Sequence, residues 1–176
     1  MPATDRIELI AADITKLDVD VVVNAANRAL AGGGGVDGAI HRAAGPELAR
    51  ACREIGGCPT GKARITPGFG LTAKWIAHAV GPIWQGGKAG EPGLLAGCYR
   101  SALQLAAEKH ARTIAFPAIS CGVYGYPLAD AADVAVTTVA ATLPELPSIE
   151  RVFHVCHGPG VLEAFEQALA RLRASS

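Results

Sequence analysis

The stretch Asn24 to His41 reads NAANRALAGGGGVDGAIH and is the most informative part of the chain. It follows an apolar run, Val19 to Val23, that is typical of a buried strand. Four consecutive glycines come next, and glycine lets a backbone adopt positive φ and approach a ligand closely. Asp37 then opens a helical pattern. A strand, a glycine loop and a helix N-terminus predict a cradle for an anion, because exposed N–H groups and the helix dipole both favour negative charge.

Generic glycine-loop motifs do not describe this stretch. A P-loop would end in Gly-Lys-Ser/Thr, whereas this loop ends in Val36-Asp37-Gly38. The dinucleotide fingerprint G-x-G-x-x-G lacks its third glycine, since position 37 is aspartate. Considered alone, the four glycines are also compatible with a flexible hairpin.

Composition limits the class of protein. The chain has 176 residues, half of them hydrophobic, with 18% charged and a formal net charge of zero. This is typical of one globular domain, and the neutral charge makes binding to duplex nucleic acid unexpected. The five cysteines have irregular spacing and no CxxC pair, which indicates reduced thiols in a cytoplasmic protein rather than a metal site. No apolar run is long enough to span a membrane, and the N-terminal residues lack a signal peptide's apolar core.

Apolar periodicity predicts alternating strands and helices. We expect strands at residues 7–11, 19–23, 63–66, 75–80, 113–119 and 152–156, and helices at residues 36–44, 46–55, 94–110, 127–143 and 160–174. The Gly- and Pro-rich segment 81–93 is expected to be a surface loop. A second polar and glycine-rich stretch, SCGVYGYP at residues 120–127, follows the apolar strand at 113–119. In open α/β sheets, ligands bind at the carboxyl ends of such strands.

These two motifs, in this order, resemble those of the macrodomain family, and within it the MacroD-type ADP-ribosyl ester hydrolases. The resemblance runs from about Ile7 to about Leu172. It implies a single macrodomain over residues 1–176, with an α/β fold that is a three-layer α/β/α sandwich around a central mixed sheet. It also implies ADP-ribose and its esters as ligands, including O-acetyl-ADP-ribose and mono-ADP-ribosylated proteins, and no metal or redox cofactor.

Backbone N–H groups of two glycine-rich loops can grip a diphosphate without any lysine or arginine. The resemblance implies that adenine lies against Asp13 and Ile14 and that Tyr124 packs on the distal ribose. Asp13 is equally suited to capping a turn, and Tyr124 to a core or surface position. The expected diphosphate-binding residues are Gly34, Gly35 and Val36 on one side, and Ser120, Cys121, Gly122, Val123 and Gly125 on the other.

Asn27 and Asp37 are the expected catalytic residues. An amide can hold a ribose hydroxyl or a water, and a carboxylate can accept a hydrogen bond from that water. The alternative is that both residues only cap a turn and a helix. His41, four residues after Asp37, is expected to contact it without acting in catalysis, and His78, His110 and His154 are expected to be structural. His157 stands where the family often has an aromatic residue beside adenine. The predicted function is hydrolysis of esters of ADP-ribose, and the alternative is binding of ADP-ribose without turnover.

Overall fold

The computed structural model describes residues 2–175, and its six strands form one sheet in the order β1-β6-β5-β2-β4-β3. Every neighbouring pair is parallel except β3 and β4, which are antiparallel, so the sheet is mixed. The strands are β1 (Ile7–Ile10), β2 (Val21–Ala25), β3 (Ala63–Pro67), β4 (Trp75–Ala79), β5 (Thr113–Phe116) and β6 (Arg151–Val155).

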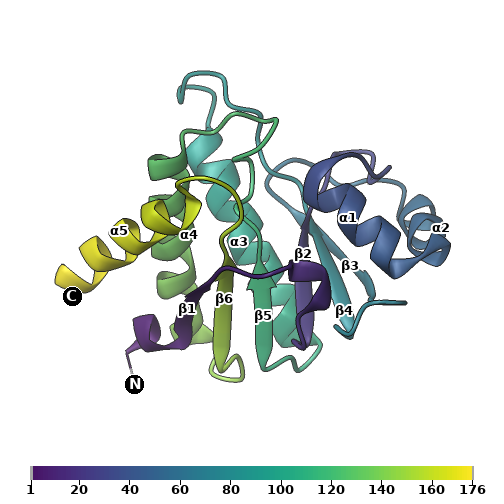
Figure 1. The fold of residues 1–176 in the computed structure, drawn as a ribbon, viewed down its shortest axis with the longest axis horizontal. Helices are drawn as coiled ribbons and strands as arrows, with labels where there is room; N and C mark the ends of the chain where they lie inside the picture. The colour runs from purple at the N-terminus through teal and green to yellow at the C-terminus, as the bar shows by residue number, and fades with distance from the viewer. Residues whose placement is uncertain (1, 176) are drawn as a thin grey trace.

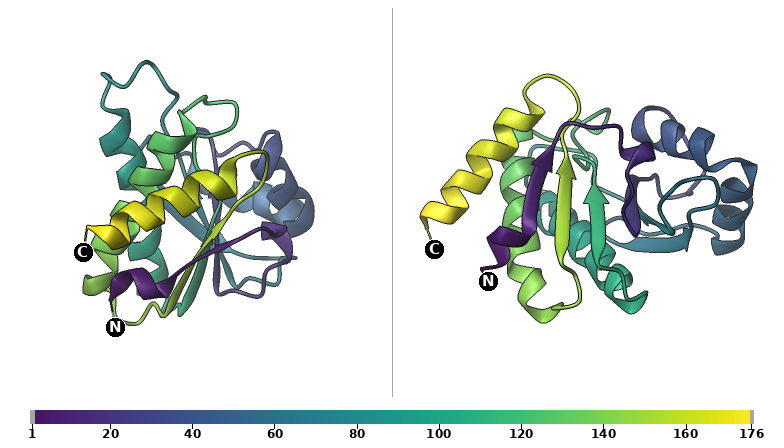
Figure 2. Two further views of the ribbon diagram at one scale, coloured as in Figure 1. Left: turned by 60° about the vertical axis from the view of Figure 1, so that its left-hand side comes forward. Right: turned by 60° about the horizontal axis from the view of Figure 1, so that its bottom comes forward.

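Helices cover both faces of this sheet (Figures 1 and 2). One face packs against α3, α4 and α5 through a large apolar cluster, and the other packs against α1 and α2 through a smaller one. The predicted three-layer α/β/α sandwich is therefore confirmed. The helices are α1 (Gly35–Ala44), α2 (Pro46–Ile55), α3 (Glu91–Glu108), α4 (Leu128–Thr142) and α5 (Val161–Ala174), with short 3-10 helices η1 (Ala3–Arg6), η2 (Ile14–Lys16) and η3 (Leu143–Glu145).

Alternation along β2 decides which residues meet which helices. Val21 and Val23 belong to the cluster beneath α3, α4 and α5, whereas Val22 belongs to the cluster beneath α1 and α2. Because side chains alternate along a strand, Asn24 lies on the same face as Val22. This face also carries Ile76 of β4, which is fully buried.

Three predicted boundaries were wrong in ways that matter for the site. β2 begins at Val21 and continues through Ala25, so Asn24 is a buried strand residue and not the start of a turn. β5 ends at Phe116, because Pro117 has no N–H for a ladder. α3 begins at Glu91, three residues before the predicted start, because its first turn, Glu-Pro-Gly, carries no apolar periodicity.

Candidate functional site

Five parallel strands bring their carboxyl ends to one edge of the sheet. The segments that follow them contain the residues predicted from sequence: Asp13 after β1, Asn27 after β2, Ser120 after β5 and His157 after β6. These segments lie along the upper edge of the sheet in Figure 1. Residues distant in the sequence therefore share the edge at which open α/β sheets bind ligands.

The first loop, residues 26–34, is held in shape by Asn27. Its amide oxygen accepts the Ala31 N–H at 3.0 Å, and its Nδ2 donates to the Gly32 carbonyl at 2.8 Å. One N–H hydrogen and one oxygen lone pair of the amide remain available. Asn27 therefore caps this turn, which was the alternative role predicted for it from the sequence.

The first loop delivers unpaired backbone donors to the start of α1. Gly34 is the N-cap residue of α1, with no side-chain cap, and Gly35 has φ of +57°, a conformation that favours glycine. Among the described residues, the N–H groups of Gly33, Gly34, Gly35 and Val36 have no hydrogen-bond partner. The helix dipole adds partial positive charge at the same point, so this turn can hold an anion.

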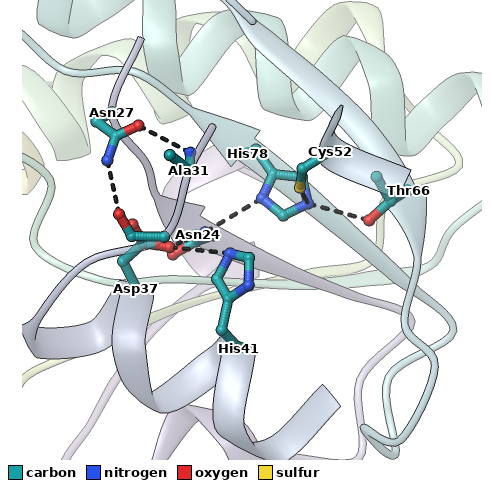
Figure 3. Close-up of polar contacts among 9 residues, drawn as sticks. Asn24, Asn27, Ala31, Asp37, His41, Cys52, Thr66 and His78 are labelled. Carbon is teal, nitrogen blue, oxygen red and sulfur yellow. Dashed lines mark hydrogen bonds and ion pairs between the residues drawn. The ribbon is translucent and has the colours of Figure 1, made fainter. Parts of the chain in front are cut away.

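Asp37 lies in the first turn of α1 but caps nothing. It is buried, with 6% of its surface exposed. Its Oδ1 accepts a hydrogen bond from Asn24 Nδ2 at 2.9 Å and lies 3.4 Å from His41 Nε2 (Figure 3). Its Oδ2 has no partner among residues 2–175, and a Cβ built on Gly33 would lie 3.4 Å from it. One carboxylate oxygen is thus fixed from two sides, and the other faces the glycine loop.

A second layer of polar side chains lies behind Asp37. Asn24 Nδ2 is 3.1 Å from Nδ1 of His78, and His78 Nε2 is 3.0 Å from the Thr66 hydroxyl (Figure 3). Cys52 Sγ of α2 is 4.0 Å from the same Nε2. Sequence reasoning missed Asn24 and Thr66 and assigned His78 only a structural role. The one local signal that could have revealed this layer is a polar residue, Asn24, at a core-facing position of an apolar strand.

The second loop, residues 117–127, also presents backbone donors, but fewer than expected. The Cys121 N–H donates to the Ala118 carbonyl and the Gly125 N–H to the Gly122 carbonyl, so neither is free for a ligand. The N–H groups of Ser120, Gly122, Val123 and Tyr124 have no partner among the described residues. The predicted contacts of Cys121 and Gly125 with a ligand therefore stay predictions, and their N–H groups would have to exchange these loop partners to make them. The donors of this loop lie at residues 120 and 122–124.

Hydrogen bonds and a ring contact with the segment that follows β4 hold the second loop in place. Ser120 has φ of +67°, and its hydroxyl donates to the Pro82 carbonyl at 2.8 Å. The Trp84 N–H donates to the Tyr124 carbonyl at 2.9 Å, and the Trp84 ring packs against Tyr126 with 4.6 Å between centroids. The Ser120 hydroxyl thus anchors the loop, and the Ser120 backbone N–H is the group that stays available to a ligand.

Glu91 organises the segment that carries Trp84. Its buried carboxylate accepts N–H bonds from Gln85, Gly87 and Ala89 at 2.7–3.0 Å. Desolvation raises the pKa of Glu91, but the backbone hydrogen bonds outweigh it and lower the pKa to about 2. The predicted loop 81–93 is therefore a supported segment that ends in the first turn of α3.

At the far end of the edge, Asp13 caps a short helix. Its Oδ1 accepts the N–H of Thr15 at 3.0 Å and the hydroxyl of Thr15 at 2.7 Å. These bonds lower the pKa of Asp13, helped by Lys16 and by His157, the residue predicted beside adenine. Its Oδ2 contacts Lys16 at 3.9 Å. Turn capping is thus observed, and the carboxylate keeps an oxygen that faces solvent.

Two surface hollows lie away from this edge. One, of about 430 Å³, lies between β1 and α5 and is lined by apolar residues with Glu166 and Arg173. The other, of about 340 Å³, lies at the amino ends of the strands beside Lys74, Lys109 and Arg112. Neither contains a glycine loop. Within residues 2–175, no cluster of metal-ligating side chains occurs, and no helix is both long and apolar enough to cross a bilayer.

The fold and the paired loops define an α/β protein with unpaired backbone donors at the carboxyl edge of its sheet, and comparisons with known proteins identify its family. The Macro domain model matches residues 23–135. A macro domain-containing protein of Chlorobaculum tepidum is 56% identical over 97% of this chain and 99% of its own length. A Salmonella gallinarum protein named O-acetyl-ADP-ribose deacetylase is 52% identical over 96% of both chains. The chain belongs to the macro domain family.

Solved structures agree with this assignment. The Oceanobacillus iheyensis macrodomain with ADP has a TM-score of 0.92 and 44% identity, covering 97% of this chain and 93% of that one. A Trypanosoma brucei macrodomain in complex with ADP-ribose has a TM-score of 0.87 and 40% identity, covering 93% and 69%. The family resemblance predicted from the two sequence motifs is confirmed.

Proposed function

We propose that this protein binds ADP-ribose and hydrolyses its esters, namely O-acetyl-ADP-ribose and ADP-ribose linked to Glu or Asp side chains of proteins. The observation that carries the proposal is Asp37, a buried carboxylate with one oxygen fixed and the other open beside a loop of unpaired N–H donors. The relative named O-acetyl-ADP-ribose deacetylase and the solved relatives that hold ADP or ADP-ribose support it.

In the proposed complex, the diphosphate lies between the start of α1 and the second loop. Gly34, Gly35 and Val36 donate from one side, and the N–H groups of Ser120 and residues 122–124 donate from the other. Adenine lies toward Asp13 and the Ile14 backbone. The distal ribose lies toward Tyr124 and the remaining N–H of Asn27. This order follows the positions of the segments along the carboxyl edge of the sheet.

Hydrolysis then requires a water held by Asp37 Oδ2. The water oxygen forms a bond to the acyl carbonyl carbon, and the ester bond to the ribose oxygen breaks. A carboxylate in the first turn of a helix is stabilised as the anion, so Asp37 orients and polarises the water. A phosphate oxygen of the substrate takes the proton and returns it to the ribose oxygen. The products are ADP-ribose and a carboxylic acid.

Turnover of O-acetyl-ADP-ribose by the wild type and Asp37→Ala tests this proposal, with ADP-ribose affinity measured on the same samples. We expect the substitution to lower kcat by about 10²- to 10⁴-fold, because the attacking water would lose the carboxylate that orients and polarises it. Affinity should change little, since backbone groups bind the ligand. Asp130→Ala is a matched control, because Asp130 occupies the corresponding first-turn position of α4 but is exposed.

The second candidate function is recognition of ADP-ribose without turnover. It is favoured by the amide of Asn27, which is already engaged in holding the first loop. Tight binding of ADP-ribose, with no release of acetate and no release of ADP-ribose from a glutamate-linked protein, would establish this function and exclude the hydrolase.

A further inference from the structure

The buried polar side chains behind Asp37 come from three adjacent strands. Asn24 of β2 is directly opposite His78 of β4 in the parallel ladder. Thr66 of β3 lies two positions from Arg64, the antiparallel partner of His78. Because side chains alternate along each strand, all three point to the face covered by α1 and α2. They are buried, with exposed fractions of 0%, 0% and 3%.

The available hydrogens fix which group donates and which accepts in each hydrogen bond of this network. Asn24 Nδ2 can only donate and faces both Asp37 Oδ1 at 2.9 Å and His78 Nδ1 at 3.1 Å, so Nδ1 is an acceptor. A neutral ring then carries its proton on Nε2, which donates to the Thr66 hydroxyl at 3.0 Å. The hydroxyl's own hydrogen is directed to the Pro67 carbonyl at 3.1 Å. Burial, and secondarily the nearby His41, lower the pKa of His78 to about 4, so the ring is neutral at pH 7.

The same count fixes the orientation of the Asn24 amide. Its two Nδ2 hydrogens go to His78 Nδ1 and Asp37 Oδ1. Its Oδ1 is buried without a partner among the described residues. A rotated amide would place that oxygen 2.9 Å from Asp37 Oδ1, a contact between two acceptors. Leaving Asn24 Oδ1 without a partner is unfavourable, but this orientation keeps a donor directed at Asp37.

We propose that His78, held by Thr66, is a positioning residue that keeps the Asn24 amide donating to Asp37 and so holds the carboxylate with Oδ2 toward the substrate. This inference rests on the proposed hydrolase function and goes beyond it, because neither residue touches the ligand edge. His41 Nε2 of α1 lies 3.4 Å from the same Oδ1, so the carboxylate lies between the sheet and a side chain of its own helix.

The test compares Thr66→Val with Thr66→Ser. Valine has nearly the shape of threonine but no acceptor for His78 Nε2, whereas serine keeps the hydroxyl. We expect Thr66→Val to lower kcat for O-acetyl-ADP-ribose by roughly 10- to 100-fold, the scale of a displaced catalytic group. The Kd for ADP-ribose should stay within about threefold, because the backbone donors of both loops are untouched. Thr66→Ser should retain most of the wild-type kcat.

His78→Leu, where it folds, should reproduce the kcat loss of Thr66→Val. Ring-nitrogen NMR shifts of His78 in the wild type should report a proton on Nε2 and none on Nδ1. A proton on Nδ1 would overturn the inference whatever the kinetics. So would wild-type kcat in Thr66→Val, or an equal loss of kcat, affinity and thermal stability in that variant.

Wild-type turnover is measured first and separates the two proposals. A wild type that binds ADP-ribose but hydrolyses none of the ester substrates contradicts the proposed function, and the positioning role fails with it. An active wild type with an unaffected Thr66→Val contradicts the positioning role alone.

Discussion

The two loops at the carboxyl edge present similar donors but are constructed differently. The first is organised by side chains: Asn27 fixes its turn, and Asn24 and His41 fix the carboxylate beside it. The second is held by the Ser120 hydroxyl and by a segment that Glu91 organises, and it presents unpaired backbone N–H groups. Val123 in this loop is fully exposed. Under the proposed function, we expect the first loop to carry the chemistry and the second to contribute affinity, and single substitutions can separate these two roles.

Among the substitutions that compare the two loops, the largest expected effect comes from Gly38→Ala. A Cβ at this position would lie 2.5 Å from the Gly33 carbonyl and 3.1 Å from Arg42 Nη1, so the first loop must move beside Asp37 Oδ2. We expect kcat to fall about 100-fold, as for a displacement near 1 Å, with a smaller loss of affinity. Gly93→Ala is the matched helical control, since its Cβ meets nothing within 4 Å. Unchanged kcat in Gly38→Ala would remove the distinction between the loops.

Gly81→Ala applies the same test to the second loop. Its Cβ would overlap the Ser120 hydroxyl and lie 2.6 Å from Ile119 Cγ2, so the loop must shift. We expect the Kd for ADP-ribose to rise about tenfold, equivalent to about 1.4 kcal/mol, while kcat at saturation changes little. Calorimetry with ADP-ribose and saturating kinetics provide the two readouts. Loss of kcat without loss of affinity would reverse the assignment of the loops.

Glu91→Gln tests the support beneath the second loop. The folded pKa of Glu91, about 2, lies below its ordinary value of 4.5, so the carboxylate contributes stability above pH 4.5. That contribution is lost as the pH falls from 4.5 through 2. We expect Glu91→Gln to be less stable than the wild type at pH 7, with a difference that shrinks in acid. Urea unfolding across this range measures it, with the exposed Glu47→Gln as control. A difference independent of pH would contradict the charge-based explanation.

The smallest expected effect is that of Cys121→Ser. The Cys121 N–H is used by the Ala118 carbonyl, and its Sγ faces the Ile119 carbonyl at 3.6 Å, a contact that a hydroxyl can also make. We expect the Kd for ADP-ribose to change by no more than about twofold, as for substitutions away from specific contacts. A larger change would indicate that this side chain contacts the ligand directly, and it would contradict the proposal that the second loop binds through its backbone N–H groups.

Much of the fold could be predicted because apolar runs and glycine breaks are local signals. The helix at 46–55 was placed at its observed bounds, and the glycine loop before Asp37 was identified from four residues in a row. The polar layer behind Asp37 could not be predicted in this way. Asn24 and His78 are 54 positions apart, and their contact exists only because β2 and β4 pair in one particular register.

The second loop shows a different limit of sequence reasoning. Its composition predicted backbone donors, but the turn from Gly122 to Gly125 consumes one of them and Cys121 uses another. Which N–H groups remain free depends on turn geometry rather than on residue type. The role of Ser120 as an anchor likewise depends on Pro82, which the sequence gives no reason to place beside it.

Neither donor segment, residues 32–36 or 118–126, contains a charged side chain. An anion held there would meet peptide dipoles instead of lysine or arginine, so there are few bound counterions for it to displace. Association should consequently be almost indifferent to ionic strength, unlike that of a cationic groove. Such an edge also offers long polyanions no row of positive charges on which to accumulate, and the abundant nucleic acid of a cell would compete poorly for it.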